Sequence, residues 1–205
     1  MPRARLRIFC LEGEWESELT DQQSVQPLLE VLKHAGGADY IHRRVATEAE
    51  LDRLLGRWRG HTSYEVLYLA SHGESGALTL GEGDPVPLER LSEKLQDSCE
   101  DAVVHLSGCQ TLRASDRSVR RFLDQTGAEA VCGYRRLVDW VPGAAMDLVL
   151  FHALAERLSK ARRPSVAAAL AALWDNHWQL AGVTSFDYAV KEGRGSRLAE
   201  ERRGS

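Results

Sequence analysis

The stretch YEVLYLASHG, residues 64–73, is a largely apolar and aromatic run that ends in Ser-His-Gly. Its side chains suit burial on both faces, which is typical of a central strand in a parallel sheet, and we predict a strand over 64–70. A second run, AVVHLSG at 102–108, is also largely apolar and leads directly into Cys109. The two runs predict buried strands whose ends carry His72 and Cys109.

Helical periodicity separates further strand candidates on both sides of this stretch. The apolar runs predict strands over 6–12, 39–45 and 128–134 and an edge strand over 184–190. Periodic apolar positions predict helices over 24–37, 47–60, 88–97, 118–127, 144–160 and 165–182, and a Gly-Asp-Pro turn predicts a hairpin over 76–88. Strands joined by helices of this length form a mostly parallel sheet covered on both faces. We therefore predict an α/β fold, a three-layer α/β/α sandwich.

Length and composition indicate one soluble globular domain. The 205 residues suffice for one sizeable core, and no linker rich in Pro, Gly or Ser divides them. We expect a single domain over 1–190. The charged, apolar-poor tail over 191–205 is expected to be mobile.

Charge and cysteine usage bear on partners and location. The formal net charge of −4 offers no basic footprint for nucleic acid or for an anionic membrane, so neither partner is expected. No apolar run approaches the ~20 residues that cross a bilayer. The four cysteines are widely spaced and form no Cys-x-x-Cys pair, which favours reduced thiols in a cytoplasmic protein.

The two strand ends place chemically useful residues together. In open parallel sheets, sites form beyond the carboxyl ends of the strands, so His72 and Cys109 would face each other if their strands are neighbours. A thiol nucleophile with an imidazole partner can carry acyl transfer. The backbone N–H groups of Gly73 and Cys109 would then bind the oxyanion, and Gly73 permits close approach because it has no Cβ. The alternative from the residues alone is a packed thiol and an ordinary loop histidine.

Three blocks of sequence extend this hypothesis. VLYLASHGESGALTL, AVVHLSGCQTL and GAEAVCGYRRLVDW resemble, in this order, the signature blocks of CHAT domains, which belong to the caspase-like (clan CD) cysteine peptidases. The likeness covers roughly residues 60–180. It implies a caspase-like sandwich, cysteine endopeptidase activity with His72 and Cys109 as the dyad, and no metal or organic cofactor. The chain departs from the family at 135–137, Arg-Arg-Leu, where Leu-Trp-Pro is common.

The residue preference before the scissile bond stays open at this stage. By the resemblance, the family aspartate of the third block falls on Asp139, which could select Lys or Arg through a charge-assisted pair. Arg135 and Arg136 could instead select an acidic residue. All three could also belong to a solvated loop after a strand.

We expect a cysteine endopeptidase that cleaves a specific protein or peptide substrate. The resemblance favours a regulated processing, defence or signalling protease with a regulatory or sensor protein as partner. Two alternatives share the fold or the dyad: a non-catalytic peptide-binding module with the caspase-like fold, and a hydrolase of a small amide or ester. His105, four residues before Cys109, has no other metal-ligand types near it in the sequence, so a metal site is not expected.

Overall fold

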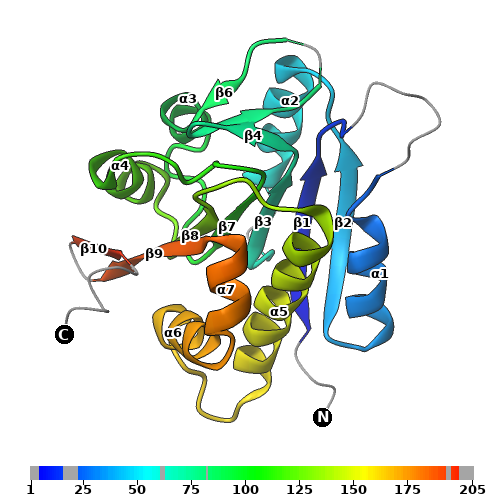
Figure 1. Cartoon of the computed structure of the whole chain (residues 1–205), viewed down its shortest axis with the longest axis vertical. Helices are drawn as coiled ribbons and strands as arrows, with labels where there is room; N and C mark the ends of the chain where they lie inside the picture. The colour runs from blue at the N-terminus through cyan, green and yellow to red at the C-terminus, as the bar shows by residue number, and fades with distance from the viewer. Residues whose placement is uncertain (1–4, 16–22, 61–62, 82, 193–194, 199–205) are drawn as a thin grey trace.

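The computed structural model describes residues 5–15, 23–60, 63–81, 83–192 and 195–198. Its main sheet has seven strands in the order β10-β9-β8-β7-β3-β1-β2 (Figure 1). The strands are β1 (Leu6–Glu12), β2 (Ala38–Arg44), β3 (Val66–Ala70), β7 (Val103–Ser107), β8 (Ala130–Tyr134), β9 (Phe186–Glu192) and β10 (Gly195–Leu198). The five strands from β2 to β8 run parallel, whereas β9 and β10 are antiparallel additions at one edge. The predicted mostly parallel sheet is confirmed.

Helices cover both faces of this sheet. They are α1 (Gln26–His34), α2 (Glu48–Trp58), α3 (Leu88–Lys94), α4 (Asp116–Thr126), α5 (Trp140–Ser159), α6 (Val166–Asn176) and α7 (Trp178–Thr184). α1, α5, α6 and α7 pack on one face around one apolar cluster, and α2, α3 and α4 pack on the other face around a second cluster. The structure confirms the predicted three-layer sandwich. None of the described helices is long and apolar enough to cross a membrane.

Alternate residues of the central strands explain why both faces are covered. In β1, Ile8 and Cys10 belong to the cluster under α1 and α5, whereas Phe9 and Leu11 belong to the cluster under α2. Successive side chains of a strand point to opposite faces, so a strand that is apolar at every position must be buried twice. The sequence run therefore requires two helical layers.

Most helix boundaries differ from the sequence prediction by one to three residues, and two differences are larger. α5 begins at Trp140, four residues before the predicted start, because Pro142 lies in its first turn, where proline is tolerated. The single helix predicted over 165–182 is two helices that meet at His177, which leaves helical geometry with φ −128°. Apolar periodicity continues across this break and could not reveal it.

A second, smaller sheet lies above the end of β3. It contains β4 (His72–Glu74), β5 (Ala77–Thr79) and β6 (Val86–Pro87), all antiparallel. β5 and β6 fall within the predicted hairpin over 76–88. β4 was not predicted, and its first residue is His72, so this histidine lies in a strand rather than in a loop.

The described part of the charged tail pairs with the sheet. The predicted edge strand over 184–190 corresponds to β9, which continues to Glu192, and β10 adds a further strand beyond it. The rest of the tail, 193–194 and 199–205, lies outside the described residues.

Candidate active site

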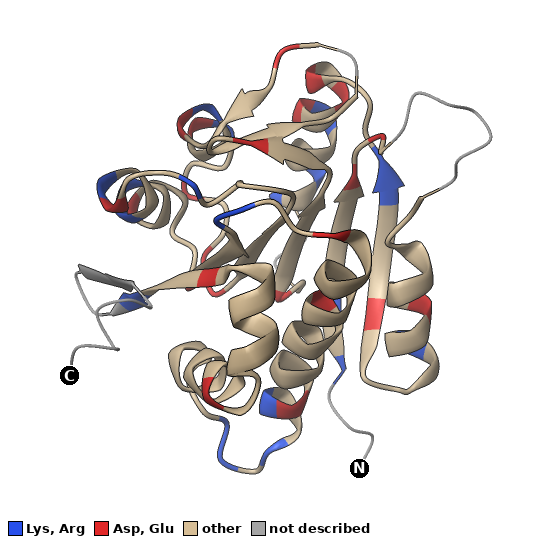
Figure 2. Cartoon of the chain, viewed as in Figure 1, with Lys and Arg blue, Asp and Glu red and all other residues tan. Residues whose placement is uncertain are grey.

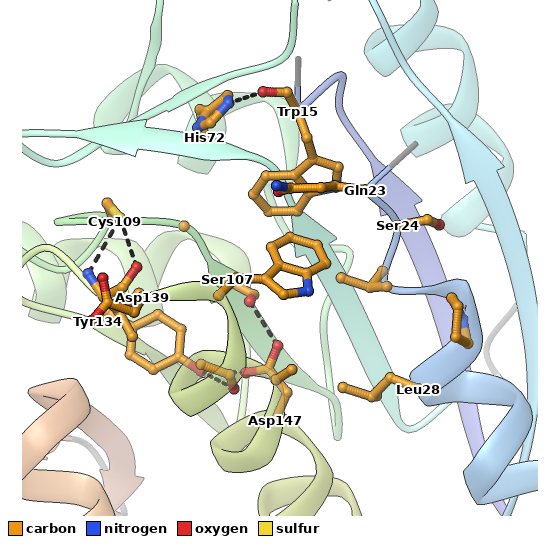
Figure 3. A pocket seen from close by; sticks show the side chains of 17 residues that line it. Trp15, Gln23, Ser24, Leu28, His72, Ser107, Cys109, Tyr134, Asp139 and Asp147 are labelled. Atoms are coloured by element: carbon orange, nitrogen blue, oxygen red, sulfur yellow. Dashed lines mark hydrogen bonds between the residues drawn. The ribbon is translucent and has the colours of Figure 1, made fainter. Parts of the chain in front are cut away.

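The ends of β3 and β7 bring His72 and Cys109 to one place. The two strands are parallel neighbours, and Ala70 lies opposite Ser107. His72 and Cys109 each follow this pair by two residues, so they lie at the same end of the sheet. His72 is exposed and Cys109 is partly buried. Both side chains line a cavity of about 350 Å³ (Figure 3).

Two glycines allow the strand ends to touch. A Cβ on Gly73 would lie 2.5 Å from the Cys109 carbonyl oxygen, and a Cβ on Gly108 would lie 2.5 Å from the Ser71 carbonyl oxygen. Both distances are far below van der Waals contact, so a side chain at either position would separate the two segments. Gly73 therefore has a packing reason to be glycine, in addition to the chemical role expected from the sequence.

Trp15 orients the His72 ring. The ring nitrogen Nε2 of His72 is hydrogen-bonded to the Trp15 carbonyl oxygen, and a carbonyl only accepts, so Nε2 carries the hydrogen. In the neutral ring Nδ1 is then the acceptor, and Figure 3 shows this nitrogen on the side of the ring nearer to Cys109. The Trp15 indole packs edge-on against His72 and Trp140, at centroid distances of 5.4 and 4.9 Å.

A buried carboxylate at the end of β1 holds Trp15. Glu12 accepts hydrogen bonds from Trp15 Nε1 at 2.7 Å, from the Val25 N–H at 2.7 Å and from the Ser24 hydroxyl at 2.8 Å, and His42 Nε2 lies 2.6 Å away. Burial alone would raise the pKa of Glu12, but these hydrogen bonds, that of His42 first, hold the pKa below its ordinary value. Trp15, Ser24 and Val25 are thereby all attached to the end of β1.

The Cys109 sulfur contacts the segment that follows β8. Sγ lies 3.4 Å from the Val138 backbone nitrogen, which donates to it, and 3.6 Å from the Val138 carbonyl oxygen (Figure 3). The Cys109 backbone N–H has no hydrogen-bond partner among the described residues, so it is available to a ligand.

The other three cysteines have a different environment. Cys10, Cys99 and Cys132 are buried in the core. Burial raises the pKa of the Cys99 thiol to about 12 and raises the pKa values of Cys10 and Cys132 well above the ordinary range. These three thiols stay protonated at neutral pH, and none of them lines the cavity.

Asp147 of α5 lies at the deep end of the cavity. Its carboxylate accepts hydrogen bonds from His105 Nε2 at 2.6 Å, the Tyr68 hydroxyl at 2.6 Å, the Ser107 hydroxyl at 2.7 Å and the Tyr134 hydroxyl. Burial alone would raise the pKa of Asp147, but the interactions with His105, Tyr134 and Tyr68 outweigh it and hold the pKa below its ordinary value.

Sequence reasoning missed the contributions of Trp15, Glu12 and Asp147. The only local signal for Asp147 is a single carboxylate on the buried face of an otherwise apolar helix. His105, considered above as a metal ligand, is hydrogen-bonded to this carboxylate. The described residues contain no group of three or more His, Cys, Asp or Glu side chains placed to hold a metal ion.

The three residues expected to determine specificity are separated. Asp139 is exposed and lines the rim of the cavity, next to the first turn of α5. Arg135 forms an ion pair with Asp187 at 3.0 Å. Arg135 and Arg136 line a different pocket, with Gln110, and not the cavity that contains His72 and Cys109. Of these three residues, Asp139 is therefore the one that lines the same cavity as His72 and Cys109.

A family comparison covers most of the chain. The sequence model of DUF6642, a family of unknown function, matches residues 5–187. The chain belongs to this family. Comparison of this DUF6642 member with curated proteins gives no match.

Solved structures similar to this DUF6642 member are clan CD cysteine proteases. A secreted C11 cysteine protease from Bacteroides thetaiotaomicron, in complex with an irreversible peptide inhibitor, matches with a TM-score of 0.52 and 8% identity over 91% of this chain and 66% of that one. Caspase-1 from Spodoptera frugiperda matches with a TM-score of 0.49 and 15% identity, over 84% of this chain and 75% of that one. The Arg-specific cysteine proteinase gingipain R matches with a TM-score of 0.48 and 12% identity, over 87% of this chain and 44% of that one. This chain therefore spans less than half of that protein's length. At these identities the likeness shows a caspase-like fold alone.

Proposed function

We propose that this chain is a cysteine endopeptidase of the caspase-like, CHAT type that cleaves a specific protein substrate. The observation that carries the proposal is the meeting of His72 and Cys109 in one cavity, with Nε2 of the imidazole bound to a carbonyl and Nδ1 toward the sulfur. The caspase-like fold supports it, because it supplies the neighbouring strand ends that carry both residues.

The reaction follows from the groups present. His72 Nδ1 takes the thiol proton, and the Cys109 sulfur forms a bond to the substrate carbonyl carbon, whose oxygen becomes an oxyanion. The N–H groups of Gly73 and Cys109 bind this oxygen, and His72 then gives its proton to the leaving amine as the C–N bond breaks. Water, deprotonated by His72, attacks the thioester, and the Cys109 thiol leaves with that proton. The scheme needs no metal or organic cofactor.

The biological setting is part of the same proposal. The CHAT-type sequence blocks favour a regulated processing, defence or signalling role and a regulatory or sensor protein partner. Four unpaired thiols, three of them buried, support a reducing, cytoplasmic setting.

Digestion of a proteome-derived peptide library, with cleavage sites mapped by mass spectrometry, tests the proposal. We expect cleavage by the parent chain and none above background by Cys109→Ala or His72→Ala. Cys99→Ala, which removes a buried thiol on the other face of the sheet, serves as the matched control and should cut as the parent does. A Cys109→Ala variant that cuts as fast as the parent would disprove the mechanism. Binding of peptides without cleavage or labelling by peptide electrophiles would indicate the non-catalytic module.

A further inference from the structure

β2 (Ala38–Arg44) is an edge strand whose outer side is available for pairing. It is the last strand in the order of the main sheet, and it pairs with β1 along its whole length of 7 residues without a bulge (Figure 1). It contains neither proline nor glycine. Among the described residues, no backbone group other than those of β1 is hydrogen-bonded to its backbone. Such an edge is a template for pairing with another strand.

The direction of the free backbone groups follows from two bonds at the ends of the strand. The N–H of Leu6 donates to the Gly37 oxygen, and the N–H of Val45 donates to the Glu12 oxygen. Backbone groups point alternately to the two sides of a strand, so the odd-numbered residues within 37–45 face β1. The even-numbered residues of β2 therefore direct their N–H and C=O groups outward.

The charges of β2 are complementary to those of a second copy in antiparallel orientation. An acidic residue, Asp39, lies near the start of the strand, and two basic residues, Arg43 and Arg44, end it (Figure 2). When Ile41 of one copy lies opposite Ile41 of the other, Asp39 of each copy lies opposite Arg43 of the other. Opposite charges directly across two strands stabilise the pairing. A register shifted by two residues would place Ile41 opposite one of these charges instead.

The same register pairs the outward backbone groups. Opposite residues of antiparallel strands alternate between pairs that exchange two hydrogen bonds and pairs that exchange none. With Ile41 at the twofold axis, Tyr40 lies opposite His42 of the other copy, and Ala38 lies opposite Arg44 of the other copy. All four are even-numbered and direct their backbone groups outward, so these are the pairs that exchange hydrogen bonds.

The two charged side chains have free capacity for a partner. Asp39 is half-exposed, and its contact with Arg5 at 3.1 Å uses one carboxylate oxygen, whereas the other oxygen has no hydrogen-bond partner among the described residues. Arg43 is exposed and has no acidic partner within the described part of the chain. It donates to the His42 carbonyl oxygen at 2.7 Å, and that oxygen has a second lone pair for another strand.

The helices next to β2 leave this edge accessible. On one face, the Tyr40 hydroxyl donates to Glu30 of α1, and the Lys33 ammonium lies 5.5 Å from the centre of the Tyr40 ring. Glu30 and Lys33 lie beside the buried face of α1 and not on it, so the helix packs inward of Tyr40. On the other face, Ile41 is only partly buried against the cluster under α2. A second Ile41 opposite it would cover the exposed part, which is favourable for an apolar side chain.

We propose that this chain forms a twofold-symmetric homodimer in which β2 pairs antiparallel with β2 of a second copy, with Ile41 at the axis. The two main sheets then form one continuous sheet. An interface made mainly of one strand pair is small, so the association is weak and depends on concentration. No residue of β2 lines the cavity that contains His72 and Cys109, so the dimer leaves the candidate active site open and does not depend on the proposed function.

Sedimentation velocity tests the proposal on the full chain. Over concentrations from ~1 µM to ~1 mM, which span weak association, we expect a shift from monomer to dimer. Arg43→Glu and Asp39→Lys each place like charges opposite each other and should raise the dimer Kd roughly tenfold. An equimolar mixture of these two variants should dimerise as the parent does, because each strand then faces opposite charges. Arg117→Glu, on the exposed surface of α4, makes the same change in net charge and is the matched control.

A chain that stays monomeric throughout would overturn the proposal. So would a dimer that Arg43→Glu does not weaken, because another surface would then hold it together.

A disulfide at the axis tests the register. In a Cys109→Ala background, Ile41→Cys places two thiols in a pair without hydrogen bonds, where the Cα atoms lie about 4.5 Å apart and a disulfide fits. Mild oxidation should therefore give a covalent dimer on a non-reducing gel. Arg43→Cys in the same background is the control, because its two copies would lie roughly 13 Å apart along the strands. With both variants natively folded by circular dichroism, equal or faster cross-linking of Arg43→Cys would contradict the proposed pairing.

Discussion

Gly73 and Gly108 determine how closely the two reactive segments approach. Each glycine lies against a carbonyl oxygen of the other segment, at distances that leave no room for a Cβ. At this scale, the sequence identified the residues that carry the proposed chemistry, because His72, Gly73 and Cys109 directly follow strong strand signals. It could not show that Trp15 holds the imidazole, because the two residues are 57 positions apart and no periodicity connects them.

The Gly73→Ala substitution should impair both packing and activity. The new Cβ would lie 2.5 Å from the Cys109 carbonyl oxygen and 2.6 Å from Thr111 Cγ2, and overpacking of this kind typically costs about 1–3 kcal/mol. Urea unfolding should show this loss, and peptide cleavage should fall at least tenfold. Gly56→Ala is the matched control, because Gly56 lies in α2 with no heavy atom within 4 Å of an added Cβ. That variant should be more stable by roughly 0.5–1 kcal/mol. Equal activity of Gly73→Ala and parent would contradict the packing account.

Thiol labelling should single out Cys109. Burial keeps Cys10, Cys99 and Cys132 protonated and inaccessible in the folded chain. With iodoacetamide at neutral pH, mass spectrometry should find one modified cysteine in the native protein and four after denaturation in guanidinium chloride. The Cys109→Ser variant should give none before denaturation. Fast labelling of Cys99 or Cys132 in the native state would show that the core opens there.

At the scale of elements, the end of β1 and the middle of α5 each hold a buried carboxylate that organises the cavity. Glu12 at the end of β1 fixes Trp15, Ser24 and Val25, and Asp147 on α5 fixes the end of β7 through Ser107. The strands and helices themselves were predicted from periodicity, with the largest errors at the first turn of α5 and at the break between α6 and α7. β4 escaped prediction because three residues are too few to show a period.

The Glu12→Gln substitution should act on His72 through Trp15. An amide NH2 would replace one acceptor oxygen and face the Ser24 hydroxyl or the His42 ring, and the loss of one buried charged hydrogen bond predicts a destabilisation of about 1–3 kcal/mol. Because the Trp15 carbonyl would lose its fixed position, the pH profile of Cys109 labelling by iodoacetamide should change. Glu89→Gln, on the exposed surface of α3, is the control. An unchanged profile with reduced stability would limit Glu12 to a structural role.

At the scale of the whole molecule, five parallel strands lie between two helical layers, and the cavity opens where β3 and β7 end. This is the site position expected for an open parallel sheet. Each helical layer packs on the sheet around its own apolar cluster, so the sheet separates two hydrophobic cores. The buried carboxylate Glu12 belongs to the sheet, and Asp147 is hydrogen-bonded to two of its strands. Both groups couple the stability of the fold to pH.

Acid should destabilise the fold through these two groups. Their pKa values in the folded chain lie below the ordinary values of 4.5 for Glu and 3.8 for Asp. The stabilisation is therefore complete above the ordinary values and is lost as pH falls through the lower folded-state values. Urea unfolding at a series of pH values should show a constant contribution near neutrality and a decline below about pH 4.5. Glu12→Gln should flatten this decline, and an equally steep decline in that variant would assign the acid sensitivity to other groups.

The sequence by itself determined the order of strands and helices, the layered α/β fold and the candidate pair His72 and Cys109. These features depend on local periodicity and on residues adjacent to strand ends, so they can be read along the chain. Only the tertiary structure decided which side chains form the cavity. Tyr68 and Asp147 are 79 positions apart, and their contact depends on how α5 packs across the sheet, for which no local pattern exists. The same packing placed Asp139 and Asp147 on the cavity that contains His72 and Cys109, and Arg135 and Arg136 on another pocket.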